Sequence, residues 1–487
     1  MIKSPKCLFF NTMDHTKISA SLLDRSTTAA SDLCFALRRT YPVFSYNAFR
    51  MFRQEMDLGI EFDFSIGDDL EFHPSLLLKN AYADSPGIEL KELEGLAFHL
   101  GLVESLSYWK TTCSPVIQVN CGHLNDEQRN WWRDLLLNGM GEFFYTNKIE
   151  IKDESFVDFL SNGGMPVNEP LKRNLQQRSM VPVGGGRDSA FTLHALSNGS
   201  RSFRTMMLNP TPAAIRVAAI VNDHNPIIIE RTLDPLLLEM NNRGFLNGHT
   251  PFSAYLAFLS ALCLAVYDYS EIVIANERSA NEPNARFSGR DVNHQYSKSL
   301  AFEEHFDLYL SRYLITTGRY FSFIRSMYEL QIAKAFATIP EMFSSFRSCN
   351  KLQRQDMWCG RCAKCASVYI TSFPFIDRNT LREIFGNDLF ELQSTVDIVR
   401  ALEGKASHRP LDCICTVDET FASLYMAISQ LEDRGESLPL ALEQLRADVY
   451  KELTTRDLKE VALRLLSSRG PDRLPSYFTE RLNESTR

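Results

Sequence analysis

Residues 181–190, with the sequence VPVGGGRDSA, join a short apolar strand to the start of a helix through three consecutive glycines. Glycine lets a backbone approach an anion closely with successive N–H groups pointing at it, and the first turn of a helix adds the positive end of its dipole. The segment therefore predicts a phosphate-binding turn. The alternative is a helix start in which Asp188 and Ser189 cap the free N–H groups and nothing binds. A Walker A loop is excluded, because the Gly-Lys-Ser/Thr ending is missing.

Strand-like and helix-like segments alternate around this turn. Further strands are expected at 203–208, 226–233 and 271–276, and helices at 188–196, 213–221 and 252–267. This alternation predicts βαβ units, and hence an α/β fold whose parallel sheet is covered by helices on both faces.

The two flanks of this region have other patterns. Before residue 160, helical patterns at 90–109 and 125–145 accompany a short apolar strand at 114–120, which predicts a mixed α+β region. A stretch rich in Gly, Pro and Asn, 161–179, is the expected domain boundary. The last part of the chain is dominated by helical patterns, at 323–337, 381–386 and 440–468.

Charge and hydropathy exclude several classes of protein. Lys and Arg number 52 against 60 Asp and Glu, a net charge of −8, so no nucleic-acid partner is expected. The N-terminus lacks the apolar core and cleavage site of a secretory signal. The longest uncharged run, 250–267, contains proline and serine and falls short of the ~20 apolar residues that span a bilayer. We therefore expect a cytoplasmic protein without a membrane partner.

Four of the 11 cysteines lie close together in the spacing C-x9-C-x2-C-x2-C. They are Cys349, Cys359, Cys362 and Cys365. Four thiolates without histidine suit tetrahedral Zn²⁺ best, with an iron–sulfur cluster as the alternative and redox or inert core cysteines as the reading without a metal. Arg361 and Lys364 can offset the negative charge of such a site. The spacing therefore predicts a structural zinc site.

Three polar segments follow predicted strands of the same α/β region, where open α/β sheets bind their ligands. Any single residue among them could equally serve a turn or a core hydrogen bond, but together they suit a substrate with many polar groups. The residues predicted to bind substrate are Asn247, Asn276, Arg278, Asn281, Asn293, His294 and Lys298.

The glycine turn resembles the pyrophosphate loop, or PP-loop, of the N-type ATP pyrophosphatases, whose pattern is Ser-Gly-Gly-x-Asp-Ser. Gly184 stands where that pattern has serine, so one hydroxyl group is missing. That family cleaves ATP between its α and β phosphates and transfers AMP to an oxygen of the substrate. The resemblance implies that ATP, Mg²⁺ and pyrophosphate are held by Gly184, Gly185, Gly186, Arg187, Asp188 and Ser189. A PP-loop followed by a four-cysteine site of nearly this spacing also occurs in 7-cyano-7-deazaguanine synthase.

A narrower resemblance covers about residues 60–420. The segments GLVESLSYWKTTCSP, FLNGHTPFSAYLAF, ANERSANEPN, VNHQYSKSLAFEEHF and WCGRCAKC, together with the glycine turn, look like the UDP-N-acetylmuramoyl-L-alanyl-L-glutamate epimerases. That family inverts the terminal glutamate of a peptidoglycan precursor with ATP and Mg²⁺ and releases AMP and pyrophosphate. The resemblance implies that a UDP-N-acetylmuramoyl dipeptide and ATP are the binding partners.

The resemblance also suggests a division into four parts. A mixed α+β domain that contacts the substrate is expected at 1–172, and a PP-loop ATP-binding domain at 173–345. The four-cysteine segment is expected at 346–375 and the helical region at 376–487.

Several residues are possible carriers of the proton at the glutamate Cα. Cys413 and Cys415 could form a thiol pair like those of cofactor-free racemases, but alternate residues of a strand point to opposite faces, so one of them is expected in the core. His249, Glu277 and Glu104 are equally defensible. The predicted catalytic residues are Asp188, Ser189, His249, Glu277 and Cys413.

Three other functions remain open at this point. The activated carboxylate could be attacked by an amine, as in 7-cyano-7-deazaguanine synthase, although the long flanks of this chain then have no purpose. A tRNA-thiolating enzyme is disfavoured by the net charge of −8. A scaffold with a decayed nucleotide site is suggested by Gly184, but the pair Asp188 and Ser189 argues against decay.

Overall fold

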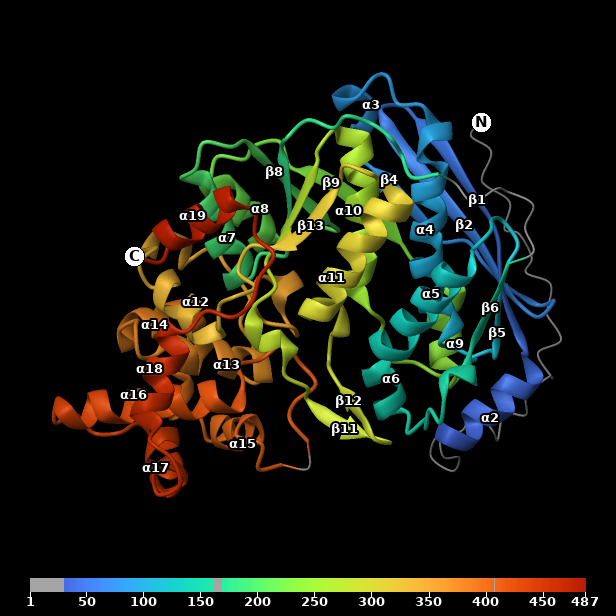
Figure 1. Ribbon diagram of the computed structural model, residues 1–487. Coiled ribbons are helices and arrows are strands. Elements are labelled where there is room, and N and C mark those ends of the chain that lie inside the picture. Colours follow the sequence, from blue (N-terminus) through green and yellow to red (C-terminus); the bar gives the residue numbers. More distant parts are fainter. Residues whose placement is uncertain (1–29, 162–168, 407) are drawn as a thin grey trace, which may run out of the picture.

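The computed structural model describes residues 30–161, 169–406 and 408–487, coloured in Figure 1. Residues 162–168 of the boundary stretch predicted at 161–179 lie outside these residues, as do the first 29 residues of the predicted N-terminal domain. Most strands of the described part form one large sheet, and helices pack around it. The C-terminal part of the chain adds a cluster of helices (Figure 1).

The sheet has 11 strands in the order β13-β10-β7-β8-β9-β4-β2-β1-β5-β6, with β3 on β2. Its strands are β1 (Val43–Gln54), β2 (Asp57–Ile66), β3 (Leu70–Phe72), β4 (Ser75–Leu78), β5 (Val116–Val119), β6 (Asp158–Ser161), β7 (Ser179–Pro182), β8 (Phe203–Leu208), β9 (Ile227–Thr232), β10 (Glu271–Ile274) and β13 (Arg319–Ser322).

Five strands, β13, β10, β7, β8 and β9, form a parallel set, as the alternating pattern predicts. All four residues of β10 are buried, which is typical of a parallel strand with helices on both faces. From β7 the chain adds β8 and β9 on one side, and it later adds β10 and β13 on the other side. The strand order therefore reverses between β7 and its neighbour β10. Ligands of doubly wound sheets bind at the carboxyl ends of such strands.

The sheet as a whole is mixed rather than parallel. Strand β4 pairs antiparallel with β9 and joins the parallel set to the N-terminal strands, and β1 and β2 form a long antiparallel hairpin. This hairpin is absent from the elements predicted above, although buried and partly exposed residues alternate along much of β2, a period of two that is the signature of a half-buried strand. A small separate hairpin contains β11 (Ala285–Phe287) and β12 (Arg290–Val292).

Helices cover the sheet and its edges. They are α2 (Ala30–Thr40), α3 (Ala81–Asp84), α4 (Leu90–Trp109), α5 (Asp126–Gly139), α6 (Gly141–Thr146), α7 (Arg187–Ser197), α8 (Pro212–Ile220), α9 (Pro235–Asn242), α10 (Phe252–Tyr267) and α11 (Leu300–Tyr309). Helix α10 is buried against α4, β7 and β10, which confirms the expectation of a buried helix at 252–267. Within the described residues, no helix is long and apolar enough to cross a bilayer.

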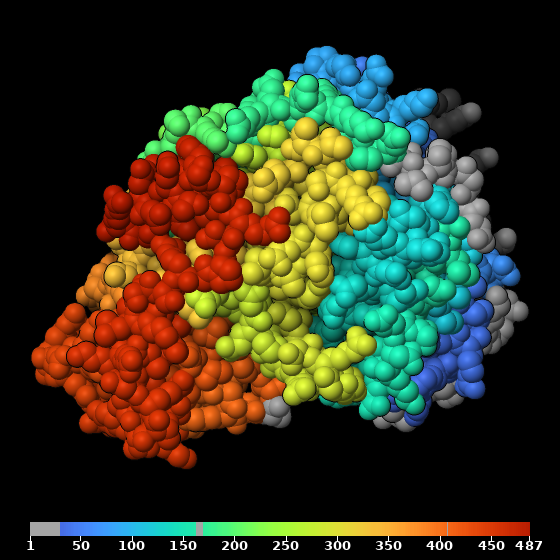
Figure 2. Space-filling view, viewed as in Figure 1, coloured from blue at the N-terminus to red at the C-terminus, as the bar shows by residue number. Residues whose placement is uncertain are grey.

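The C-terminal part is helical, as predicted. It contains α12 (Glu329–Phe336), α13 (Ala363–Ser372), α14 (Arg378–Phe385), α15 (Gln393–Leu402), α16 (Val417–Asp433), α17 (Leu440–Leu453), α18 (Leu458–Ser467) and α19 (Ser476–Glu484). The helix predicted at 323–337 begins only at Glu329, because β13 and a turn occupy the residues before it. In Figure 2 the yellow segment around β11 and β12 separates the cyan N-terminal helices from the orange and red C-terminal ones.

Candidate active site

In the glycine turn between β7 and α7, the carbonyl groups accept hydrogen bonds from other residues, whereas the N–H groups have no hydrogen-bond partner among the described residues. Gln353 donates to the carbonyl of Gly184 at 2.7 Å, and the backbone N–H of Arg347 donates to that of Gly185 at 2.8 Å. Within the described part of the chain, the N–H groups of Gly184, Gly185 and Gly186 donate to no other residue. Free N–H groups beside a helix N-terminus form a ready anion site.

Gly185 is the position in this turn where a side chain does not fit. Its φ of +84° is rarely adopted by residues with a Cβ, and a Cβ built there would lie 2.4 Å from the backbone nitrogen of Ala214 at the start of α8. A Cβ at Gly184 would meet nothing within 4 Å. Glycine is therefore required at position 185, where the turn packs closely on α8. Position 184 has open space for a side chain.

The turn opens onto a cavity of about 340 Å³ at the carboxyl ends of β7 and β10. Eight of the residues singled out by the sequence analysis line it: Gly184, Gly186, Asp188, Ser189, Asn276, His294, Lys298 and Cys413. These residues come from segments more than 200 positions apart in the chain, and the structure brings them to one site. The remaining polar lining residues, which the sequence analysis did not assign to it, are Ser253, Ser260, Gln295, Tyr320, Ser348, Asn350, Gln353 and Lys364.

Three carboxylates gather beside the cavity. Oxygen atoms of Asp188, Glu277 and Glu329 lie within 4.8 Å of one another. Glu277 is 1% exposed, and neither of its carboxylate oxygens has a hydrogen-bond partner among the described residues. A buried carboxylate without a partner is unfavourable, and carboxylate oxygens are the ligands that Mg²⁺ prefers. The donor set therefore fits a magnesium ion at the phosphate-binding turn.

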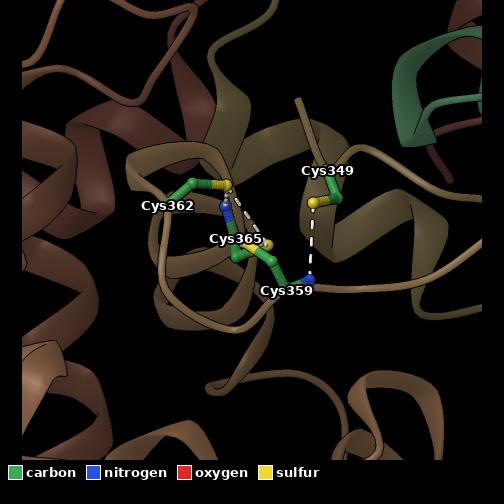
Figure 3. Close-up of side chains that lie close together, drawn as sticks. All are labelled: Cys349, Cys359, Cys362 and Cys365. Atoms are coloured by element: carbon green, nitrogen blue, oxygen red, sulfur yellow. Dashed lines mark hydrogen bonds between the residues drawn. The ribbon is translucent and has the colours of Figure 1, made fainter. Parts of the chain in front are cut away.

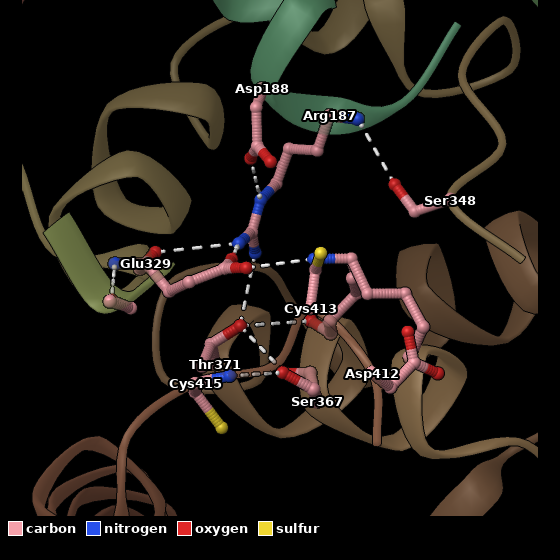
Figure 4. Close-up of polar contacts among 12 residues, drawn as sticks. Arg187, Asp188, Glu329, Ser348, Ser367, Thr371, Asp412, Cys413 and Cys415 are labelled. Atoms are coloured by element: carbon pink, nitrogen blue, oxygen red, sulfur yellow. Dashed lines mark hydrogen bonds and ion pairs between the residues drawn. The ribbon is translucent and has the colours of Figure 1, made fainter. Parts of the chain in front are cut away.

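Arg187 turns its side chain away from the cavity. Its guanidinium group forms an ion pair with Glu329 inside the protein and donates to Thr371 at 3.0 Å (Figure 4). The Arg187 side chain is 1% exposed and is absent from the described lining residues, so any contact of Arg187 with a nucleotide would come from its backbone. Its backbone N–H donates to Ser348 at 3.1 Å.

Lys364 bonds to the same carboxylate. Its Nζ atom lies 2.8 Å from Glu329 Oε1. Burial alone would lower the pKa of Lys364, but the nearby charges of Asp188 and Glu277 raise it above the ordinary value. The sequence predicts that Lys364 offsets charge at the cysteine site, but the structure places it in the cavity wall.

Cys413 also belongs to the lining, and it lies next to two cations. Lys298 Nζ lies 3.3 Å from its Sγ atom, and His294 lies on the same side and bonds to Glu142 through Nδ1. Burial opposes ionisation of Cys413, but Lys298 and His294 outweigh it and lower the pKa of the thiol below its ordinary value. Burial alone would lower the pKa of His294, but Cys413 and Glu142 raise it to about 10.

Cys413 and Cys415 lie in an irregular segment before α16, not in a strand. Cys415 is fully buried, and its Sγ contacts Thr420 Oγ1 at 3.4 Å. Figure 4 shows it beside Ser367, to which its backbone donates at 2.9 Å. The expectation that one of the two cysteines belongs to the core is thus met by Cys415.

The other predicted proton carriers lie outside the lining. His249 stacks at a tilt on His294 with 4.7 Å between ring centroids, and burial lowers its pKa to about 4. Glu104 is 1% exposed and forms a two-pronged ion pair with Arg231 at 2.8 and 2.9 Å. Glu104 is therefore committed to a structural contact.

Four of the predicted substrate-binding residues brace loops. Asn281 accepts from the N–H of Leu300 at the start of α11, and Asn293 donates to the carbonyl of Ala280 at 2.7 Å. Asn247 accepts from the next N–H in the chain, and Arg278 covers the ring of Tyr328 at 4.4 Å. None of these four is among the described residues of the cavity lining.

The four cysteines converge around one point at the N-terminus of α13 (Figure 3). Their sulfur atoms lie within 4.8 Å of one another, with 3.4 Å from Cys362 to Cys365 and 3.8 Å from Cys359 to Cys365. Sulfurs around a tetrahedral Zn²⁺ at ~2.3 Å stand ~3.8 Å apart. Cys349 accepts from the N–H groups of Leu352 and Cys359, contacts typical of a thiolate ligand. The cluster fits a tetrahedral metal ion.

Similarity to known proteins supports one reading of this site. Residues 36–323 match the family described as the MurL N-terminal domain, and residues 345–459 match the MurL C-terminal domain. A protein of Micromonospora sp. named UDP-N-acetyl-alpha-D-muramoyl-L-alanyl-L-glutamate epimerase is 28% identical over 394 residues, covering 79% of this chain and 84% of that protein. A protein of the same name from Xanthomonas oryzae pv. oryzae is 28% identical over 389 residues, with the same coverage. A third, from Salinispora tropica, is 30% identical over 314 residues, covering 64% of this chain and 67% of that protein.

Proposed function

The chain belongs to the MurL family, and from this premise we propose that it epimerises the terminal L-glutamate of UDP-N-acetylmuramoyl-L-alanyl-L-glutamate to D-glutamate through an acyl-adenylate, releasing AMP and pyrophosphate. The names of the relatives support an isomerase that acts on this UDP-muramoyl dipeptide. The reaction belongs to peptidoglycan precursor synthesis, which takes place in the cytoplasm.

One observation carries the ATP-dependent mechanism. A glycine turn with free N–H groups opens onto a cavity at the reversal point of a doubly wound sheet, directly beside three clustered carboxylates. Free N–H groups suit the phosphates of ATP, and Asp188 and Glu277 suit Mg²⁺, whereas Glu329 is already paired with Arg187 and Lys364. When bound there, the ion would neutralise charge on the pyrophosphate that leaves. The loop is thus proposed as a PP-loop.

Adenylylation removes the main obstacle to epimerisation. A proton on the carbon beside a carboxylate is very weakly acidic, because its loss would place two negative charges together. A neutral acyl-adenylate lacks this repulsion, and each pKa unit gained is worth about 1.4 kcal/mol. Proton exchange at Cα followed by hydrolysis of the adenylate then releases the inverted glutamate and AMP.

The other residues have supporting roles in this proposal. Asn276, His294 and Lys298 line the cavity and offer amide and cationic groups to the glutamate carboxylates. The four cysteines hold a structural Zn²⁺ at the start of α13, the helix that carries Lys364. The proposal keeps the four-part division expected from the sequence, with the N-terminal part contacting the UDP-muramoyl part of the substrate, although one continuous sheet joins the first two parts.

The proposal is tested by isotope exchange in heavy water. Incubation with UDP-N-acetylmuramoyl-L-alanyl-L-glutamate, ATP and Mg²⁺ should invert the terminal residue, place deuterium at its Cα and form AMP and pyrophosphate. Omission of ATP should prevent all of these changes. AMP formation without exchange would instead indicate an adenylylating ligase, especially if it required an added amine. Absence of both AMP and exchange would contradict the enzymatic proposal.

A further inference from the structure

We propose that Cys413 exchanges the proton on one face of the glutamate Cα, an inference that rests on the epimerase function proposed above. Cys413 lines the cavity onto which the glycine turn opens, together with Asp188 and Ser189. A carboxylate activated in this cavity would therefore have its Cα within the same space as the thiol.

A second, smaller cavity adjoins the first at this cysteine. The two cavities share His294, Gln295, Lys298 and Cys413 as lining residues. The side toward the turn receives the activated carboxylate, and the side beyond the shared residues, lined by Asn284, Asn293 and Arg409, leads away from it. In this proposal the glutamate Cα lies at the shared residues, because there the thiol borders the space in front of the glycine turn.

The surroundings of Cys413 favour the thiolate, which is the basic form. The Lys298 ammonium group contacts Sγ at 3.3 Å, and His294 faces it from the loop after β12. Glu142 on α6 accepts from His294 and keeps the imidazole charged. Two further charged groups face this point, Glu277 after β10, which opposes ionisation of the thiol, and Lys364 on α13, which favours it. The cations prevail, and the pKa of Cys413 lies below its ordinary value.

The Cα–H bond breaks and an S–H bond forms at Cys413, while the electron pair of the C–H bond moves onto the acyl group of the adenylate. The opposite face of Cα takes a proton from a donor of the same cavity, for which the Tyr320 side chain is available, and this donor regains its proton from solvent. The thiol then returns its proton to solvent. No oxidant or reductant is needed.

The remaining candidate bases are committed elsewhere among the described residues. Glu104 is bound to Arg231, and Cys415 is enclosed in the core. Glu277 and Asp188 belong to the carboxylate cluster that suits a cation. His294 contacts both Glu142 and Cys413, so it acts as a positioning residue for the thiolate.

The first experiment separates adenylylation from proton exchange. Cys413→Ala is compared with wild type and with the matched control Cys415→Ala, in heavy water with UDP-N-acetylmuramoyl-L-alanyl-L-glutamate, ATP and Mg²⁺. We expect Cys413→Ala to form AMP and pyrophosphate while deuterium incorporation at Cα falls at least a hundredfold, and Cys415→Ala to retain both activities.

Exchange by Cys413→Ala at a rate near that of wild type would overturn the inference while leaving the proposed function intact. Loss of AMP formation together with exchange would assign Cys413 to binding or folding and would also overturn it. If wild type itself shows no exchange, the proposed function fails and this inference fails with it.

The second experiment needs no substrate. Iodoacetamide alkylation of Cys413, followed by mass spectrometry of its peptide, reports the thiolate fraction as a function of pH. We expect alkylation of the wild-type residue to be half-maximal below the pH of an ordinary thiol. In Lys298→Met the profile should move upward by about one pH unit or more, because an adjacent positive charge is lost. An ordinary thiol profile in wild type, or the same profile in both proteins, would contradict a thiolate held by Lys298.

Discussion

The side chains of Arg187 and Glu329 form an ion pair directly beneath the glycine turn, and both are closed to solvent. The pair joins the first residue of α7 to the first residue of α12. Figure 4 shows Arg187 reaching from the turn toward Glu329, with Asp188 beside it. Because Glu329 also binds Lys364, this one carboxylate connects the turn, the cavity wall and the helix at whose N-terminus the cysteine cluster lies.

The first prediction concerns the stability of this pair. Arg187→Met should lower the free energy of unfolding by about 3–5 kcal/mol, because it leaves the buried Glu329 charge with one partner fewer. Arg50→Met removes an ion pair between Arg50 and Glu61, whose side chains are 68% and 42% exposed. This substitution should change the free energy of unfolding by less than about 1 kcal/mol. Urea unfolding of both variants measures the difference. Equal effects in the two variants would show that burial of the pair is unimportant.

The second prediction uses the two glycines at the start of the turn. Gly185→Ala should abolish ATP binding, because the new Cβ would collide with the backbone at Ala214 and the positive φ would be strained. Gly184→Ala should bind ATP as wild type does, since its Cβ would enter open space. Equilibrium titration of each variant with ATP and Mg²⁺ is the measurement. The prediction is wrong if both substitutions are tolerated.

The third prediction concerns the carboxylate cluster. Asp188→Asn and Glu277→Gln should each weaken binding of Mn²⁺, a spectroscopic substitute for Mg²⁺, by about tenfold or more, since even outer partners of metal ligands contribute 10–100-fold. Glu480→Gln, an exposed carboxylate on α19, serves as the control. Electron paramagnetic resonance of free Mn²⁺ provides the affinities. Unchanged affinity in Glu277→Gln would remove that residue from the cation site.

The fourth prediction concerns the four cysteines. Purified protein should contain about one zinc ion per chain, and Cys362→Ser should lose both the metal and part of its thermal stability. Cys121→Ser, at a cysteine remote from the cluster, should keep the metal. Elemental analysis and thermal unfolding with and without a chelator give the result. An iron–sulfur absorption band, or metal-free protein of full stability, would contradict a structural zinc site.

The fifth prediction is a pH dependence caused by His99. Burial lowers the pKa of this imidazole to about 4, whereas an unfolded histidine has a pKa of about 6.5. Between these values the unfolded chain binds the proton and the folded chain does not, so stability falls as pH drops through this window, by about 3 kcal/mol at pH 4, and is unaffected by His99 above it. In His99→Gln the loss between pH 7 and pH 4.5 should be smaller by about 2 kcal/mol. His73→Gln, at an exposed histidine, should behave as wild type. Urea unfolding at the two pH values measures these changes.

Features that arise from neighbouring residues could be predicted from the sequence. The glycine turn, the four-cysteine spacing and the alternation of strands and helices around β7, β8 and β9 are encoded within windows of about 10–20 residues. The buried helix at 252–267 was predicted for the same reason, since its apolar run exceeds one helical face. The long hairpin of β1 and β2 has a weaker sequence pattern, a period of two. In the structure it extends the parallel set into a mixed sheet.

Features that depend on distant residues were decided by the tertiary structure alone. Arg187 and Glu329 are 142 positions apart, and Lys298 and Cys413 are 115 positions apart, so no local pattern relates them. Arg187 was expected at the nucleotide, but the start of α7 turns its side chain inward to a buried carboxylate. Of two cysteines separated by one residue, the fold exposes Cys413 to the cavity and encloses Cys415. The sequence determined which chemical groups are present and where the backbone can form a phosphate-binding turn, whereas long-range packing determined which of those groups face the cavity, because burial and charge pairing depend on contacts that only the folded chain makes.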